Sequence, residues 1–197
     1  SFLLSKCRRI FNFEYSIAML SALLVSLHVL NEHDISTSVN SFCDIKNSKD
    51  TIDIFNLKKA EEDYTEEKEE EIFTNLCKNW HGDSVPEHQL LLNCEKYFSP
   101  DAQTRILVIL SDFRGQRAKE KIENEIGSFE NRKLKEAVLK NQEKNYVILG
   151  VGLGSRYIAE HLFTDSLQIT ADNFFSMPNL IGTEIARLIQ IHHSLRS

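Results

Sequence analysis

Hydrophobic residues follow different patterns in different segments of this chain, and each pattern predicts a type of element. Arg105–Ser111 and Tyr146–Val151 are apolar at nearly every position, which is typical of parallel strands that are covered on both faces. Ile35–Phe42 alternates apolar and polar residues, which predicts a half-buried strand. Shorter strands are predicted at Thr51–Phe55 and Leu167–Thr170.

Segments with helical spacing separate these strands. The predicted helices cover, in chain order, Tyr15–Leu30, Glu70–Lys78, Ser84 to about Phe98, Lys119–Asn141, Ile158–Leu162 and Pro178–His193. Strands that alternate with helices predict an α/β fold with a doubly wound, mainly parallel, Rossmann-like sheet and helices on both faces. The length, together with the lack of a repeat or a Gly/Ser linker, predicts a single domain over residues 1–197.

One segment has the outline of a targeting signal. Lys6, Arg8 and Arg9 precede the apolar stretch Ile17–Leu30. That stretch has 14 residues, which is too short to span a bilayer, and polar residues 31–34 follow it instead of a small-residue cleavage site. We interpret it as a core helix that is packed against the sheet.

The negative charge of the chain is local. The net charge is −6, and Glu61–Glu71 alone contains eight acids and one lysine. Because like charges four residues apart destabilise a helix, we expect a solvent-exposed insertion over about residues 58–70, or alternatively a docking surface for a basic partner. The most basic stretch, Arg114–Lys144, has nine bases against six acids, so no nucleic-acid partner is expected.

The four cysteines, at positions 7, 43, 77 and 94, have no spacing that suggests a metal site or a redox pair. We interpret them as small core residues of a reduced protein. This predicts an intracellular protein, cytoplasmic or nuclear, without a membrane segment.

Candidate chemistry lies where the central strands end, because ligands of doubly wound sheets bind beyond the carboxyl ends of the strands. Asp112 directly follows the first apolar strand, and Asp83 and Ser84 lie just before the preceding helix. Oxygen ligands of this kind are what Mg²⁺ prefers. The alternative is that Ser84 and Asp112 only cap helices.

Other chemical motifs are incomplete. Gly150, Gly152 and Gly154 resemble a phosphate-binding loop, but the full pattern needs a glycine where Ser155 stands, so we interpret them as a tight connection from a strand to a helix. The sequence contains no G-x-S-x-G elbow and nothing else that argues for nucleophilic catalysis.

Several segments resemble, in order, the von Willebrand factor A (VWA) domain family. Arg105–Asp112 resembles the strand that ends in the family's SDG motif, and Tyr146–Gly154 resembles the next strand, which ends in GIG. The similarity continues through Arg156-Tyr157, Phe163–Ser166 and the last helix. The tail is most similar to VWA domains attached to AAA+ machines, of the cobaltochelatase-subunit and midasin type.

The resemblance implies a metal-ion-dependent adhesion site (MIDAS). In the family this site combines D-x-S-x-S after the first strand, a threonine before a helix, and the aspartate of the SDG strand. Asp112 matches that aspartate, Ser84 or Asp83 stands where the threonine belongs, and Phe113 replaces the usual glycine. Ser1 resembles the last serine of the first motif, so we expect Ser1 as a further metal ligand and the first central strand to be missing from the chain.

The resemblance therefore predicts a non-enzymatic protein-interaction module, with a magnesium site that is incomplete in this chain and that an acidic residue of a protein partner completes. An AAA+ ATPase is the expected assembly partner. One alternative is a structural scaffold with a dead metal site. A less favoured one is a metal-assisted hydrolase that uses Asp112 with His81 or His88.

Overall fold

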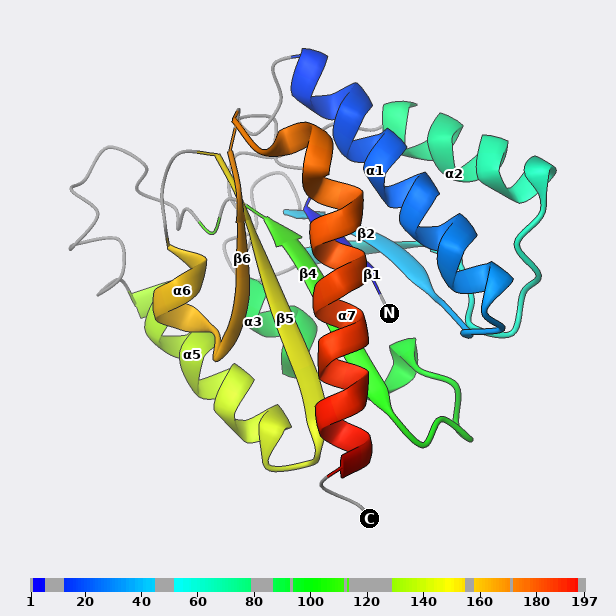
Figure 1. The fold of residues 1–197 in the computed structure, drawn as a ribbon. Helices are drawn as coiled ribbons and strands as arrows, with labels where there is room; N and C mark the ends of the chain where they lie inside the picture. Colours follow the sequence, from blue (N-terminus) through cyan, green and yellow to red (C-terminus); the bar gives the residue numbers. More distant parts are fainter. Residues whose placement is uncertain are drawn as a thin grey trace.

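The computed structural model describes residues 2–5, 13–44, 52–78, 87–92, 94–111, 113, 129–154, 158–170 and 172–194. Within these ranges, one six-stranded sheet has the order β3-β2-β1-β4-β5-β6 (Figure 1). All neighbouring strands are parallel except the β2–β3 pair. The strands are β1 (Phe2–Ser5), β2 (Val39–Asp44), β3 (Ile52–Lys58), β4 (Arg105–Ser111), β5 (Tyr146–Leu153) and β6 (Asp165–Ile169). The predicted α/β fold with a mainly parallel sheet is confirmed.

Helices cover both faces of this sheet. They are α1 (Phe13–Glu32), α2 (Glu66–Lys78), α3 (Glu87–Leu92), α5 (Phe129–Gln142), α6 (Ala159–Leu162) and α7 (Met177–Ser194), with short 3₁₀ turns η1 (Cys94–Tyr97) and η2 (Phe174–Ser176). Figure 1 shows α1, α2 and α7 on one face, and α3, α5 and α6 on the other. Each face has its own hydrophobic core.

The two apolar runs form adjacent central strands, as predicted. Val108 of β4 pairs with Leu149 of β5, and both side chains are buried. The segment with the outline of a signal is the core helix α1, whose residues Leu23 and Leu27 pack into the core of its face. Every helix among the described residues is too short or too polar to cross a membrane.

The expectation that the first central strand is missing is wrong. β1 lies in the middle of the sheet, and Phe2 pairs with Val39 of β2 on one side and Val108 of β4 on the other. The strand has four residues, three of them apolar, which is too short for a period to appear in the sequence. The adjoining serine at position 1 resembles the end of a metal motif, which drew the expected strand to a place upstream of the chain.

The acidic segment is partly helical, which corrects the predicted start of the helix, and most of its acids are exposed, as expected. Helix α2 begins at Glu66, four residues before the predicted Glu70. Thr65 Oγ1 accepts a hydrogen bond from the Lys68 backbone N–H (3.2 Å), which caps the helix. Acids in the first turn also interact favourably with the positive end of the helix dipole, and this outweighs their mutual repulsion.

Candidate functional site at the carboxyl ends of the strands

The carboxyl ends of three parallel strands meet at one edge of the sheet. Leu4 of β1 pairs with Leu110 of β4, and Ser111 of β4 pairs with Gly152 of β5. The residues that end β1 and β4, Ser5 and Ser111, therefore lie at the same edge, where the sequence analysis placed its candidate site.

The predicted metal ligands themselves, Asp112, Ser84, Asp83 and Ser1, lie outside the described residues. So does His81 of the hydrolase alternative, whereas His88 is the half-buried second residue of α3. The proposed role of each of these residues stays a prediction.

A buried hydrogen bond joins the two chain segments that flank these ligands. The Ser111 hydroxyl donates to Glu87 Oε1 over 2.6 Å, and both residues are almost fully buried. Ser111 directly precedes Asp112, and Glu87 begins helix α3 three residues after Ser84. The structure thus brings together the neighbours of two predicted ligand loops.

Sequence reasoning missed Glu87 as part of this edge of the sheet. The sequence from Ser84 to Glu87 has the spacing of a capping box, in which the glutamate serves only the start of its helix. The buried position of the carboxylate is a tertiary feature, and a glutamate in the first turn of any helix has the same local signature. The only sequence feature that could have indicated a buried Glu87 is that this charged residue lies shortly before a run of three leucines.

Phe113 shows why the related motif has a glycine at this position. Its φ angle is 49°, in the left-handed region that favours glycine. The Phe113 backbone N–H donates to Ser111 Oγ over 3.2 Å, and its ring centroid lies 4.9 Å from that of Phe163. The buried phenylalanine therefore offsets an unfavourable backbone conformation with packing and a hydrogen bond.

The three glycines of the β5 segment have packing and conformational roles. A Cβ on Gly150 would lie 2.2 Å from Phe163 Cδ2, and one on Gly152 would lie 2.4 Å from Gln168 Oε1. Gly154 has a φ angle of 104° and donates its N–H to the Ile169 carbonyl (2.8 Å). Gly150 and Gly152 lie inside β5, where neighbouring side chains leave no room for a Cβ, so the predicted tight connection after the strand can apply to Gly154 alone.

The position of β1 also tests how well the chain fits a magnesium site. In the MIDAS pattern the first aspartate and two serines follow the first strand. Here β1 ends at Ser5, and the sequence continues Lys6-Cys7-Arg8-Arg9. Magnesium prefers carboxylate and other oxygen ligands, so a thiol and three cations do not fit this part of the site. Within the described residues, no cluster of three or more His, Cys, Asp or Glu side chains is suited to a metal.

The sequence matches no protein-family model, and no curated protein matches it. Solved structures do match. The VWA domain of SpRpn10 superposes with a TM-score of 0.60 at 12% identity, over 91% of this chain and 92% of that one. The fold is VWA-like.

Two further structures have a similar fold. Proximal thread matrix protein 1 from the mussel byssus matches with a TM-score of 0.62 at 13% identity, over 93% of this chain and 46% of that chain. The pilus adhesin SpaC from Lactobacillus rhamnosus GG matches with a TM-score of 0.54 at 8% identity, over 93% of this chain and 30% of that one. The match thus covers less than half the length of each of these two chains.

Proposed function

We propose that this chain is a non-enzymatic protein-interaction domain that binds partners without a metal ion. The observation that carries the proposal is the position of β1. With β1 present, the VWA-like sheet is complete, and the sequence after its central strand is basic where a MIDAS has acidic and hydroxyl ligands.

The similar structures support binding as the activity. They include a thread matrix protein of the mussel byssus and a pilus adhesin, and an adhesin acts by binding. A partner carboxylate, which a metal ion recognises in the MIDAS pattern, could pair directly with Lys6, Arg8 or Arg9. The partner is therefore still expected to present an acidic residue, but basic side chains of this chain bind it in place of a metal ion.

The metal-dependent form of the proposal is the version that we favour less. In it, Asp112 with Ser84 or Asp83 would hold Mg²⁺, and a partner carboxylate would complete the coordination. Ser1 precedes the amino end of β1, whereas Asp112 follows the carboxyl end of the parallel strand β4, so this form does without the predicted ligand Ser1. Association with an AAA+ ATPase is also a proposal, and it rests on the sequence motifs alone.

Affinity capture from a cell extract tests the proposal. The full chain is used as bait with Mg²⁺ or with EDTA, together with an Asp112→Ala chain and a K6E/R8E/R9E chain. We expect the same partners with Mg²⁺, with EDTA and with Asp112→Ala, and their loss with the triple reversal. The matched control is R132E/K135E/K140E on the exposed surface of α5, which should retain them.

Two results would overturn this expectation. Release of all partners by EDTA and by Asp112→Ala would favour the metal-dependent form. A bait that captures nothing above the background of an unrelated domain would argue against an interaction function altogether.

A further inference from the structure

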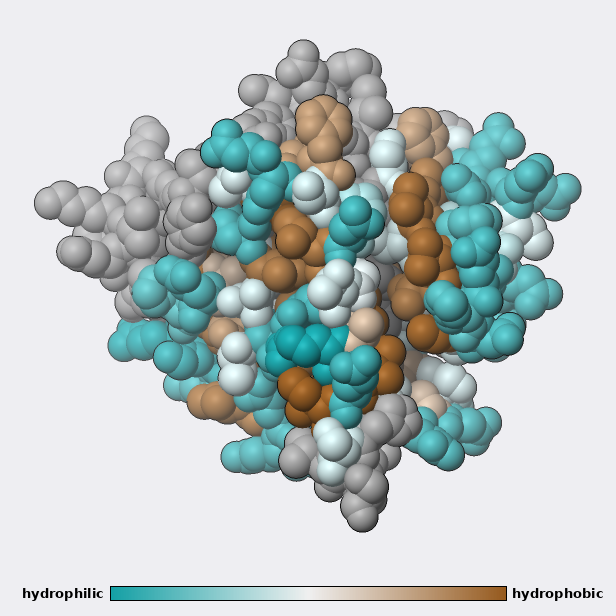
Figure 2. All heavy atoms as spheres, in the orientation of Figure 1, coloured by the Kyte–Doolittle hydropathy of each residue, from teal (hydrophilic) through white to brown (hydrophobic). Residues whose placement is uncertain are grey.

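An apolar groove runs between α1 and α7, on the outer surface of the face that they cover. Its volume is about 370 Å³, and no Asp, Glu, Lys or Arg lines it. Val25 and Val29 of α1 form one wall and are 50% and 43% exposed, whereas Gly182 and Ala186 of α7 lie opposite. Figure 2 shows hydrophobic side chains in a row over α1, beside α7. Exposed valines along a groove are typical of a surface that another chain covers.

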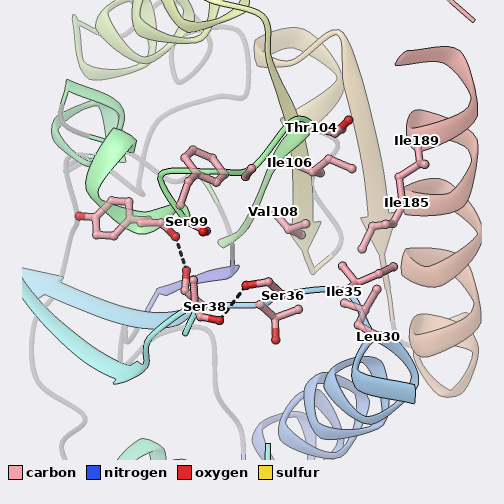
Figure 3. Close-up of a pocket in the computed structure, with 15 residues that line it drawn as sticks. Leu30, Ile35, Ser36, Ser38, Ser99, Thr104, Ile106, Val108, Ile185 and Ile189 are labelled. Carbon is pink, nitrogen blue, oxygen red and sulfur yellow. Dashed lines mark hydrogen bonds between the residues drawn. The ribbon is translucent and has the colours of Figure 1, made fainter. Parts of the chain in front are cut away.

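At one end the groove opens into a deeper recess of about 300 Å³ between β4 and α7. Leu30, Ile35, Ile185 and Ile189 line both spaces. Figure 3 shows these side chains around the same space as Val108 of β4.

Two of the serine hydroxyls at the recess are already engaged by the protein. Ser36 Oγ donates to the Ala60 carbonyl (2.7 Å), and Ser38 Oγ donates to the Tyr97 carbonyl (2.5 Å; Figure 3). Ser99 and Thr104 add further hydroxyls to the lining, but most of its side chains are apolar, so a large apolar side chain suits the recess.

The recess lies at the opposite edge of the sheet from the candidate site. Ser38 directly precedes β2 and Thr104 directly precedes β4, and both residues line the recess. Since these strands are parallel to β1, the recess is at their amino ends, whereas Ser111 is at the carboxyl end of β4. The two surfaces can therefore be tested separately.

Three exposed acids lie next in sequence to residues that line the groove or the recess. Glu32, Asp34 and Glu61 are exposed. Each is next in sequence to a residue that lines the groove or the recess, namely His33, Ile35 and Ala60. Glu61 also begins the acidic segment that continues into α2.

Fewer exposed cations than acids border the groove and the recess. Lys59 is exposed next to Ala60, and Lys96 is exposed next to Tyr97. Arg105 and Arg187 are engaged by the protein, Arg105 with the Tyr146 hydroxyl and the Pro100 carbonyl, and Arg187 with Glu184 and Asp165. The groove thus combines a largely apolar lining, free of Asp, Glu, Lys and Arg, with a margin in which exposed acids outnumber exposed lysines.

We propose that the α1–α7 groove binds a basic amphipathic helix of a partner protein, with one apolar side chain in the recess. An apolar groove accepts the apolar face of a helix, and the acidic margin attracts Lys or Arg on its flanks. The inference rests on the interaction function proposed above. It adds the α1–α7 groove as a second binding surface and a basic amphipathic helix as the kind of partner.

Peptide binding to the full chain tests the partner chemistry. The probe is a fluorescent peptide of about 18 residues, with leucines on one helical face and lysines on the other. A matched peptide has glutamate in place of every lysine. By fluorescence anisotropy we expect the lysine peptide to bind about tenfold or more tightly than the glutamate peptide. Equal affinities would overturn the proposal.

Substitutions at Gly182 test the location. No atom lies within 4 Å of a Cβ built at this position, so a side chain there meets open space. Gly182→Arg places a long cation in the groove and should weaken binding of the lysine peptide about tenfold. Gly182→Ala is the control and should bind as the wild type does. Unchanged binding by Gly182→Arg, with both proteins folded by circular dichroism, would overturn the location.

Charge reversals test the acidic margin. E32K/E61K should weaken binding of the lysine peptide and reduce its dependence on salt, because exposed charges act through a screened attraction. The matched control is E136K/E143K, a pair of exposed acids at α5 and the turn after it, on the other face of the sheet. If both pairs of substitutions weaken peptide binding equally, only the net charge of the protein matters, and the acids beside the groove do not recognise the peptide.

Failure of this inference can be distinguished from failure of the proposed function. Asp112→Ala and EDTA should leave peptide binding unchanged, because they act at the other edge of the sheet. If the purified chain dimerises in size-exclusion chromatography and Gly182→Arg makes it monomeric, a second copy occupies the groove and the basic-helix proposal is wrong. Loss of captured partners without loss of peptide binding would count against the proposed function alone.

Discussion

Ser111 is the residue on which the carboxyl edge of the sheet depends most directly. Its hydroxyl donates to Glu87 and accepts from the Phe113 backbone N–H, and all three residues are buried. Ser111→Ala removes both interactions at once. We expect it to lower the free energy of unfolding by about 2 kcal/mol, because buried polar groups lose a partner. Chemical denaturation measures this directly.

Glu87→Gln is the matched control for Ser111→Ala. An amide oxygen can still accept from the Ser111 hydroxyl, so the hydrogen bond is retained while the carboxyl group is replaced by an amide. We expect a smaller loss of stability than with Ser111→Ala. If Ser111→Ala has the same free energy of unfolding as the wild type, whatever the result for Glu87→Gln, the hydrogen bond does not stabilise this edge.

Cys94 predicts how stability responds to alkaline pH. Burial raises the pKa of the Cys94 thiol from 9.0 to about 11, although nearby Lys144 acts in the opposite direction. Between these values the folded protein keeps a proton that the unfolded chain has lost, so stability falls as pH rises. From about pH 8 to about pH 10.5 the wild type should lose about 2 kcal/mol more than Cys94→Ala. Equal losses in denaturation at the two pH values would contradict a buried, protonated thiol.

Residue-level features were predictable where they follow from local pattern. The burial of Val108 and Leu149 follows from continuous apolar runs. The burial of Glu87 could not be predicted, because it depends on a hydroxyl 24 residues away in the sequence. The left-handed backbone conformation of Phe113 could not be predicted from its own sequence either, because only the resemblance to a motif with glycine at this position suggested it.

At the scale of elements, helix α2 shows how a cap can outweigh like-charge repulsion. Thr65→Ala removes the side-chain acceptor for the Lys68 N–H. We expect a loss of about 1 kcal/mol in unfolding free energy. The first turn of α2 should also exchange its amide hydrogens faster. Unchanged exchange at residues 66–69 would show that Thr65 does not hold the start of this helix.

Two glycines form a matched pair for testing packing between elements. Gly150→Ala would drive a Cβ against the Phe163 ring, and we expect it to destabilise the protein by about 1 to 3 kcal/mol through overpacking. Gly182→Ala meets open space in an exposed stretch of α7 and should stabilise by up to about 1 kcal/mol through helix propensity. Thermal unfolding that moves in the same direction for both would contradict the placement of Gly150 against Phe163.

Element types were predictable to the extent that the elements are long. The 20-residue α1 and the seven-residue β4 carry a clear period or an unbroken apolar run. The four-residue β1 carries neither, and the family motif then directed attention to a missing upstream strand. Its place in the sheet is determined by pairing with β2 and β4, which is information that a local window does not contain.

For the whole molecule, the order of elements was enough to predict the layered architecture. Alternating strands and helices lead to a parallel sheet with helices on both faces, and the VWA-like neighbours have the same arrangement. The groove between α1 and α7 was not predicted, because it depends on two helices that are distant in the sequence. The molecule therefore offers two candidate surfaces at opposite edges of one sheet.

The central claim is that this interaction domain works without a metal ion, and calorimetric titration of the 197-residue chain with MgCl₂ tests it most directly. The three cations and one thiol that follow β1 in the sequence predict no saturable heat of binding at millimolar magnesium, with the same trace for Asp112→Asn. A saturable signal in the wild type that Asp112→Asn abolishes would contradict metal independence and restore the magnesium site.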